Sequence, residues 1–131
     1  MEKTMTITMP GPAMGKPRMT QRDKWAKRDC VVRFYAWANH LKLLVKTAGG
    51  VPATERILDV SWVAKFEPPR STSKKRREAM IGELHRVKPD RDNIDKAVLD
   101  ALFDKDQGIA SGTIRKEWAE ESALVITITF R

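Results

Sequence analysis

The period at which apolar residues recur changes along the chain, and the order of these changes constrains the fold more than any other feature. Residues 4–9 and 58–66 alternate between polar and apolar, which predicts two strands that each bury one face. Between them, apolar residues recur at three- and four-residue spacing over 34–45, which predicts an amphipathic helix. Asp29 is the expected N-cap of that helix, and the glycines at 49–50 are expected to end it.

The second half of the chain repeats this change of period. Apolar residues within 94–102 follow helical spacing, with Asp92 able to cap the helix and Asp95 to complete a capping box. Residues 114–119 allow a strand, and residues 124–130 alternate more clearly. The order strand, helix, strand, helix, strand, strand predicts an α+β fold in which a small mixed sheet packs against two main helices. With 131 residues and 41% hydrophobic content, the chain is expected to form a single domain over 1–131.

Several classes of protein are disfavoured by what the sequence lacks. Cys30 is the only cysteine, so no intrachain disulfide is possible and a cytoplasmic location is expected. No stretch has the length and hydrophobicity of a membrane span, and residues 1–9 lack the pattern of a signal peptide. Cys30, His40 and His85 do not have the spacing of a zinc site. We therefore expect no membrane association and no structural zinc.

Basic residues outnumber acidic ones, 25 to 17, and the formal net charge is +8. They gather in two segments, 16–28 and 70–77, both expected to lie on the surface as loops or short turns. Such clustering favours a polyanionic partner, and nucleic acid is the leading candidate. Trp25, within the first segment, is a candidate for stacking on an unpaired base, although packing is the commoner role of such a residue. The residues expected to contact DNA phosphates are Lys16, Arg18, Arg70, Lys74, Lys75, Arg76 and Arg77.

Two aspartates, Asp90 and Asp92, stand just ahead of the second predicted helix. If the extended backbone that Pro89 favours continues through them, their side chains project from the same side. Mg²⁺ is commonly held by one or two carboxylates, with water and phosphate completing its octahedron. Lys96, one turn into the helix, could then offset charge that develops during phosphodiester cleavage. The same residues also allow a simpler interpretation, in which Asp92 caps the helix, Asp90 is solvated, and Lys96 forms surface ion pairs with Asp92 and Asp100.

The longer stretch KPDRDNIDKAVLDALFD, residues 88–104, resembles the signature of the RusA family of Holliday-junction resolvases, K-P-D-x-D-N-x-x-K-x-x-x-D-A-L, at every fixed position. The segments 16–18 and 73–90 are also similar to the family, so the resemblance extends over most of the chain. It implies a Mg²⁺-dependent endodeoxyribonuclease, with Mn²⁺ as a possible substitute. It further implies that Asp90 and Asp92 are catalytic metal ligands and that Lys96 is the catalytic lysine.

The family's third acid usually closes a doublet in a pattern that resembles D-D-x-Q-I, whereas this chain has DKDQGI over 104–109. Counting back from Ile109 selects Asp106 as the third catalytic metal ligand, and counting from Gln107 brings Asp104 into contention. A helix over 93–102 travels roughly 15 Å, and the four residues after it can return at most roughly 14 Å. Either the helix ends early, or the loop runs straight back, or Asp106 completes another site, such as one in a partner subunit.

The resemblance also implies a homodimer acting on a four-way DNA junction, because paired cuts in a two-fold symmetric substrate are most simply made by two symmetric sites. The apolar strands over 58–66 and 124–130 offer possible edges for pairing between subunits. Two alternatives remain: a non-catalytic basic DNA-binding protein, and a nuclease that acts on other branched DNA such as flaps and forks. A bacterial, phage or prophage source is expected from the resemblance.

Overall fold

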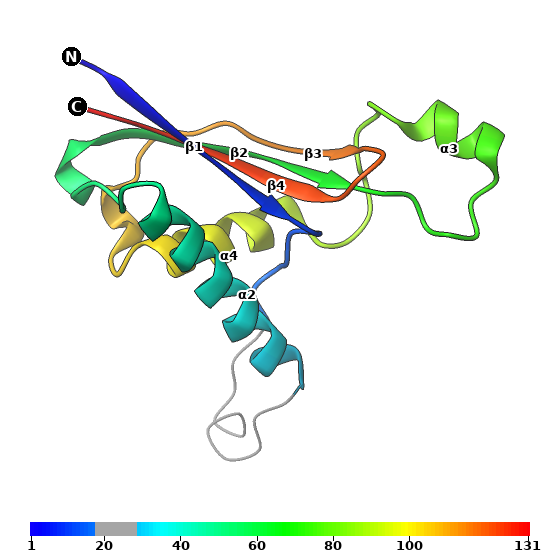
Figure 1. Cartoon of the computed structure of the whole chain (residues 1–131), viewed down its shortest axis with the longest axis horizontal. Helices are drawn as coiled ribbons and strands as arrows, with labels where there is room; N and C mark the ends of the chain where they lie inside the picture. The colour runs from blue at the N-terminus through cyan, green and yellow to red at the C-terminus, as the bar shows by residue number, and fades with distance from the viewer. Residues whose placement is uncertain (18–28) are drawn as a thin grey trace.

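The computed structural model describes residues 1–17 and 29–131, which form a four-stranded sheet with helices against one face (Figure 1). The strand order is β1-β4-β2-β3, with β1 and β2 antiparallel to β4 and with β3 parallel to β2. This mixed sheet confirms the predicted α+β fold. The strands are β1 (Lys3–Pro10), β2 (Ile57–Phe66), β3 (Ile114–Trp118) and β4 (Ala123–Phe130).

Two long helices cover one face of the sheet, and a short helix lies apart from it (Figure 1). The long helices are α2 (Asp29–Thr47) and α4 (Arg91–Leu102), which pack against each other. The short helix α3 (Lys74–Met80) extends beyond the end of the sheet. Two single turns of 3-10 helix, η1 (Thr54–Arg56) and η2 (Asp106–Gly108), complete the elements. No helix in the described ranges has both the length and the apolar character needed to cross a bilayer.

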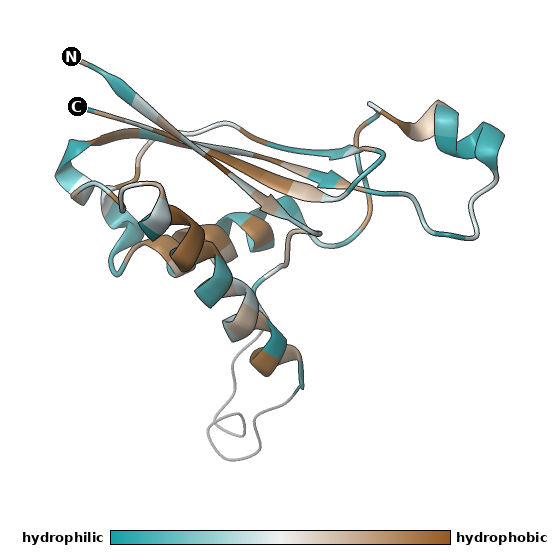
Figure 2. Cartoon of the chain, in the orientation of Figure 1, coloured by the Kyte–Doolittle hydropathy of each residue, from teal (hydrophilic) through white to brown (hydrophobic). Residues whose placement is uncertain are grey.

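The hydrophobic core lies between the sheet and the two long helices, where Figure 2 shows apolar colour on the facing surfaces. The period-two alternation sends every second side chain of β2 and β4 inward, and the helical spacing of α2 and α4 supplies the opposing wall. Burying each such aliphatic side chain contributes about 1.5–3 kcal/mol. The fully buried side chains include Leu41, Trp62, Ile94, Val98, Leu124, Ile126 and Ile128.

Two expectations about the strands are wrong. Leu58 is only half-buried, because a register shift between Ile57 and Asp59 places Ile57 and Val60 on the core side instead. The strands β2 and β4 are both interior, hydrogen-bonded on each side, so neither is an open edge for subunit pairing. The sheet ends instead at β1 and β3.

The connection from β2 to α4 places the start of α4 beside the edge of the sheet. After β2 the chain passes through α3 and returns alongside β3, where Leu84 forms an antiparallel bridge with Glu117. Further backbone hydrogen bonds join Glu83 to Trp118 and His85 to Lys116. The segment that leads into Asp90 is therefore built onto the outer edge of β3.

Candidate active site

Lys116 of β3 holds the loop that precedes the two aspartates. Its ammonium donates hydrogen bonds to the carbonyl oxygens of Val87, at 2.6 Å, and Pro89, at 2.7 Å. The Lys88–Pro89 peptide bond within this loop is cis. Because the two carbonyls lie on either side of Lys88, two residues before Asp90, their shared donor fixes the path by which the chain enters α4.

His85 forms the buried base of this region. Its ring stacks on Phe66, with centroids 4.1 Å apart, and lies 4.4 Å from the ring of Trp118. Burial lowers the pKa of the imidazole, and the positive charge of Lys116 lowers it further. Its Nδ1 atom is buried without a hydrogen-bond partner among the residues that the structure describes. His85 therefore favours the neutral form in the folded protein.

Asp90 and Asp92 lie at the first turn of α4 and line one open groove of about 650 Å³, together with Lys88, Arg91 and Lys116. The helix begins one residue earlier than its predicted cap: Asp90 occupies the N-cap position, and Asp92 lies within the first turn. The extended path therefore does not continue through Asp92. Both carboxylates nevertheless face the same groove.

The carboxylate oxygens of this pair are little used by the helix itself. Asp90 makes no side-chain capping hydrogen bond, and Asp92 accepts one from the adjacent Asn93 N–H, at 3.0 Å. Both side chains are exposed. Two carboxylates with open oxygens, next to space for water and phosphate, form a donor set that Mg²⁺ accepts. The pair thus fits the predicted metal, and any further ligand must come from elsewhere.

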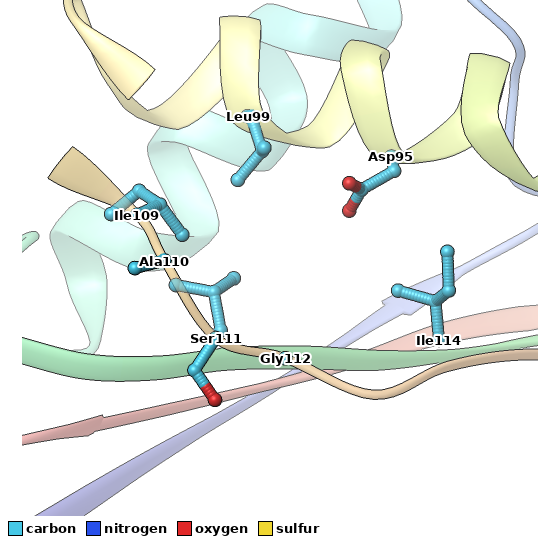
Figure 3. Close-up of a pocket in the computed structure, with 8 residues that line it drawn as sticks. Asp95, Leu99, Ile109, Ala110, Ser111, Gly112 and Ile114 are labelled. Carbon is cyan, nitrogen blue, oxygen red and sulfur yellow. The ribbon is translucent and has the colours of Figure 1, made fainter. Parts of the chain in front are cut away.

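Asp95 does not complete a capping box, because its carboxylate points toward the sheet (Figure 3). Its Oδ1 accepts a hydrogen bond of 2.9 Å from Nε1 of the buried Trp62. The side chain also lines a cavity of about 200 Å³ between α4 and the chain leading into β3. Asp95 therefore joins the helix to the sheet and takes no part in the groove.

Lys96 lies one helical turn beyond Asp92, with an exposed side chain. Among the described residues it forms no ion pair with Asp92 or Asp100, so the surface pairs of the simpler interpretation are not observed. Lys96 does not line the groove that contains Asp90 and Asp92. Its ammonium is exposed on the helix that carries Asp92.

Asp106 and Asp104 lie at the opposite end of α4 from the two aspartates (Figure 1). The helix runs its full 12 residues, a length of about 18 Å, before the chain turns. Asp106 then opens η2, which packs on η1 so closely that a Cβ added to Gly108 would lie 2.6 Å from Cγ2 of Thr54. The helix does not end early, and the loop does not run back.

The predicted ligand set of Asp90, Asp92 and Asp106 is therefore not assembled within one subunit. No group of three His, Cys, Asp or Glu side chains close enough to hold a metal occurs in residues 1–17 and 29–131. Within one subunit, α4 lies between Asp106 and the two aspartates. The structure thus brings two of the three predicted acids together and separates the third.

A comparison with known protein families bears on this arrangement. The model of the family described as Endodeoxyribonuclease RusA matches residues 10–129. The chain belongs to the RusA family. The RusA family consists of endonucleases of Holliday junctions, so the chain is a nuclease whose class of substrate is branched DNA. A search of curated proteins found no match.

Lys16, expected to bind DNA in this RusA-family chain, is engaged within the fold. Its ammonium pairs with the carboxylate of Asp100, and its backbone N–H donates to the carbonyl oxygen of Asn93 at 3.2 Å. A Cβ added to the neighbouring Gly15 would lie 3.3 Å from Cβ of Asn93, so this loop packs tightly against the start of α4. Asp100 therefore has a structural role, because its pairing with Lys16 joins this loop to α4. Arg18 and Trp25 lie outside the described residues.

The second basic segment, residues 70–77, leads into and forms most of α3, where Figure 2 shows hydrophilic colour. This segment is called the α3 arm below. Ser73 caps this helix by accepting from the N–H of Arg76 at 3.3 Å. Arg77 differs from its neighbours, because its guanidinium donates to the carbonyl oxygens of Pro68 and Pro69. The predicted phosphate contacts that stay exposed on the arm are Arg70, Lys74, Lys75 and Arg76.

Among the residues of the site that the sequence analysis missed are two arginines and a lysine. Arg86 and Arg91 line the groove beside the two aspartates, and Lys116 holds the loop above it. Arg91 stands between the two aspartates in the family signature, and that adjacency could have suggested it. Lys116 has no such signal, because 24 positions separate it from Asp92 and only the sheet brings them together.

Proposed function

We propose that this protein is a Mg²⁺-dependent endonuclease that resolves Holliday junctions by paired nicks, in DNA recombination and repair. The observation that supports this most is the placement of Asp90 and Asp92 in one groove, with carboxylate oxygens that the helix leaves open. Mn²⁺ is expected to substitute, because oxygen ligands suit both ions. Membership of the RusA family supports the choice of substrate.

Each residue has a separate part in the proposed reaction. Asp90 and Asp92 would hold the cation, because both line the groove. A bound Mg²⁺ supplies Lewis acidity toward the phosphate and lowers the pKa of a coordinated water. Lys96, exposed one turn further along α4, offsets the negative charge that grows on the phosphate during cleavage.

The active form is proposed to be a two-fold symmetric homodimer. A four-way junction has the same symmetry, and one site in each subunit would nick two strands in equivalent positions. In an antiparallel arrangement of the two α4 helices, the end that bears η2 in one subunit meets the start of α4 in the other. The partner subunit's Asp106 would then complete the ligands around Asp90 and Asp92.

The exposed basic residues of the α3 arm are proposed to hold duplex phosphates away from the scissile bond. Arg70, Lys74, Lys75 and Arg76 carry no ion pair among the described residues. Contacts of this kind position the DNA without reading its sequence, and they weaken steeply with salt. Truncating them should weaken binding equally for all junction sequences.

The decisive experiment incubates a labelled synthetic four-way junction with and without Mg²⁺, comparing the wild type with Asp92→Asn. We expect symmetric nicks from the wild type only with Mg²⁺ or Mn²⁺. Asp92→Asn should bind the junction but cleave it at least ~100-fold more slowly, because the amide removes a negative ligand and spares the basic contacts. Asp29→Asn, an exposed aspartate in the first turn of α2, is the matched control and should cleave normally.

Cleavage by Asp92→Asn at the wild-type rate would contradict the proposal that Asp92 is a metal ligand. Flap and fork substrates of the same arm length, run in parallel, separate a resolvase from a nuclease of other branched DNA. Faster cleavage of flaps or forks than of the junction would assign the chemistry to that other substrate.

A further inference from the structure

The groove that contains the two aspartates continues past them along the outer edge of β3. A second cavity, of about 380 Å³, adjoins the first and reaches Thr113 and Arg115. Both cavities share the same wall and base, formed by His85, Arg86, Arg91 and Lys116. The two cavities are therefore neighbours, together called the channel below, and the carboxylates line only the first of them.

The charge along this channel is strongly positive away from the carboxylates. Across both cavities the acidic lining residues are Asp90 and Asp92, whereas five basic residues line the same walls. The second cavity has no acidic lining residue at all. A phosphate next to two carboxylates is repelled by them, so cations just beyond the pair are needed to hold a DNA strand there. The basic lining residues are Arg86, Lys88, Arg91, Arg115 and Lys116.

The contacts within the protein show which of these cations are free to bind a phosphate. The Lys116 ammonium donates hydrogen bonds to two backbone carbonyls, and Arg115 pairs with Glu117 at 3.3 Å. Arg86, Lys88 and Arg91 are exposed and have no ion pair within residues 1–17 and 29–131, but only the two arginines line both cavities. A guanidinium also matches two phosphate oxygens at once, which an ammonium does not.

We infer that the DNA strand to be cut enters the site along this channel, and that Arg86 and Arg91 bind the phosphates that flank the scissile one. The channel is a second DNA-binding element, separate from the α3 arm, and it sets the direction of the strand relative to α4. The inference rests on the proposed nuclease function, because it assumes that the bound strand is the one that is cut. The binding of a phosphodiester strand can be measured without any cleavage.

The test measures junction affinity in EDTA at a series of salt concentrations, for the wild type and for Arg86→Gln combined with Arg91→Gln. Each phosphate contact contributes about 0.9 to the slope of log affinity against log salt on duplex DNA. The proposed dimer carries two copies of each arginine, so the double variant should lose four phosphate contacts and about 3.6 from the slope. Lys42→Gln with Lys46→Gln removes the same charge from exposed positions on α2 and should keep the wild-type slope.

Arg86→Lys with Arg91→Lys retains the charge and should recover most of the slope, with cleavage still reduced because an ammonium lacks the paired donors. Thermal melting of each variant confirms that the fold is kept. The proposed role of the channel is contradicted if the double Gln variant keeps the wild-type slope. It is also contradicted if the α2 control loses as much slope as the double Gln variant. If the slope falls as expected while the wild type cleaves nothing, the channel stands and the nuclease proposal fails.

Discussion

At the scale of single residues, the groove depends on side chains that hold the backbone around it in place. Lys116 touches neither aspartate by hydrogen bond, yet it donates to the two carbonyls on either side of Lys88. His85 lies beneath, between two aromatic rings, and its backbone N–H donates to the carbonyl of Lys116. Together, Lys116 and His85 fix the position of the loop that leads into Asp90.

Replacing Lys116 with Met should lower junction cleavage at least ~10-fold and raise the Mg²⁺ concentration needed for half-maximal rate. The methionine keeps the packing length but leaves two carbonyls without their donor, so the loop before Asp90 loosens. Binding of the junction in EDTA should change much less than the rate does. Lys116→Arg should restore part of the lost activity, and a Mg²⁺ dependence equal to the wild type in Lys116→Met would remove the positioning role.

The lowered pKa of His85 predicts a dependence of stability on pH. The pKa of the unfolded histidine lies near its ordinary value of 6.5, and burial holds the folded pKa below that. Between these two pKa values the unfolded chain binds more protons, so stability is complete above pH 6.5 and falls as the pH drops through the folded pKa. His85→Phe, which keeps a ring between Phe66 and Trp118, should lose this part of the pH dependence. Urea unfolding from pH 5 to 7.5 measures it, and identical pH profiles would contradict the assignment.

At the scale of elements, α4 is held by polar contacts on two sides. Trp62 donates to Asp95 from the sheet, and Lys16 pairs with Asp100 from the loop after β1. The tight approach of Gly15 to Asn93 closes the same loop on the start of the helix. The helix that carries Asp92 and Lys96 is thus fixed in rotation, which keeps the aspartates toward the groove.

A double-mutant cycle of Lys16→Ala and Asp100→Ala should give a coupling free energy of about 1 kcal/mol, since the pair is partly shielded from water. Chemical denaturation of the four proteins supplies the values. The salt slope of junction binding should be nearly unchanged in Lys16→Ala, because the ammonium is occupied by Asp100. A slope lower by about 1.8, from one lost contact in each subunit of the proposed dimer, would show instead that Lys16 contacts a phosphate, as the sequence analysis expected.

At the scale of the whole molecule, the separation of Asp106 from the groove makes the dimer proposal testable. Mixed dimers of Asp92→Asn and Asp106→Asn subunits carry one doubly altered site and one fully intact site if each site draws on both subunits. We expect the mixed dimers in such mixtures to regain nicking of a single strand, because each mixed dimer carries one intact site. If the acids act within one subunit, neither site is intact, and the mixtures stay as inactive as each variant alone.

The features that the sequence determined by itself depend on residues close together in the chain. The periods over 34–45, 94–102 and 124–130 set which faces of α2, α4 and β4 are buried, because those faces follow from backbone geometry alone. Asp90 and Asp92 could be proposed from the sequence because candidate ligands for one ion can lie close together in the chain. Leu58 was misplaced because a bulge, which has no period, reverses the alternation.

Tertiary structure alone decided how these parts combine. Lys16 meets Asp100 across 84 positions, and Lys116 meets Pro89 across 27, through packing that no local pattern encodes. The same holds for Asp106, whose distance from the groove follows from the length of α4 and the docking of η2 on η1. The period of a segment is set by its own backbone, whereas the neighbours of a side chain are set by the whole fold.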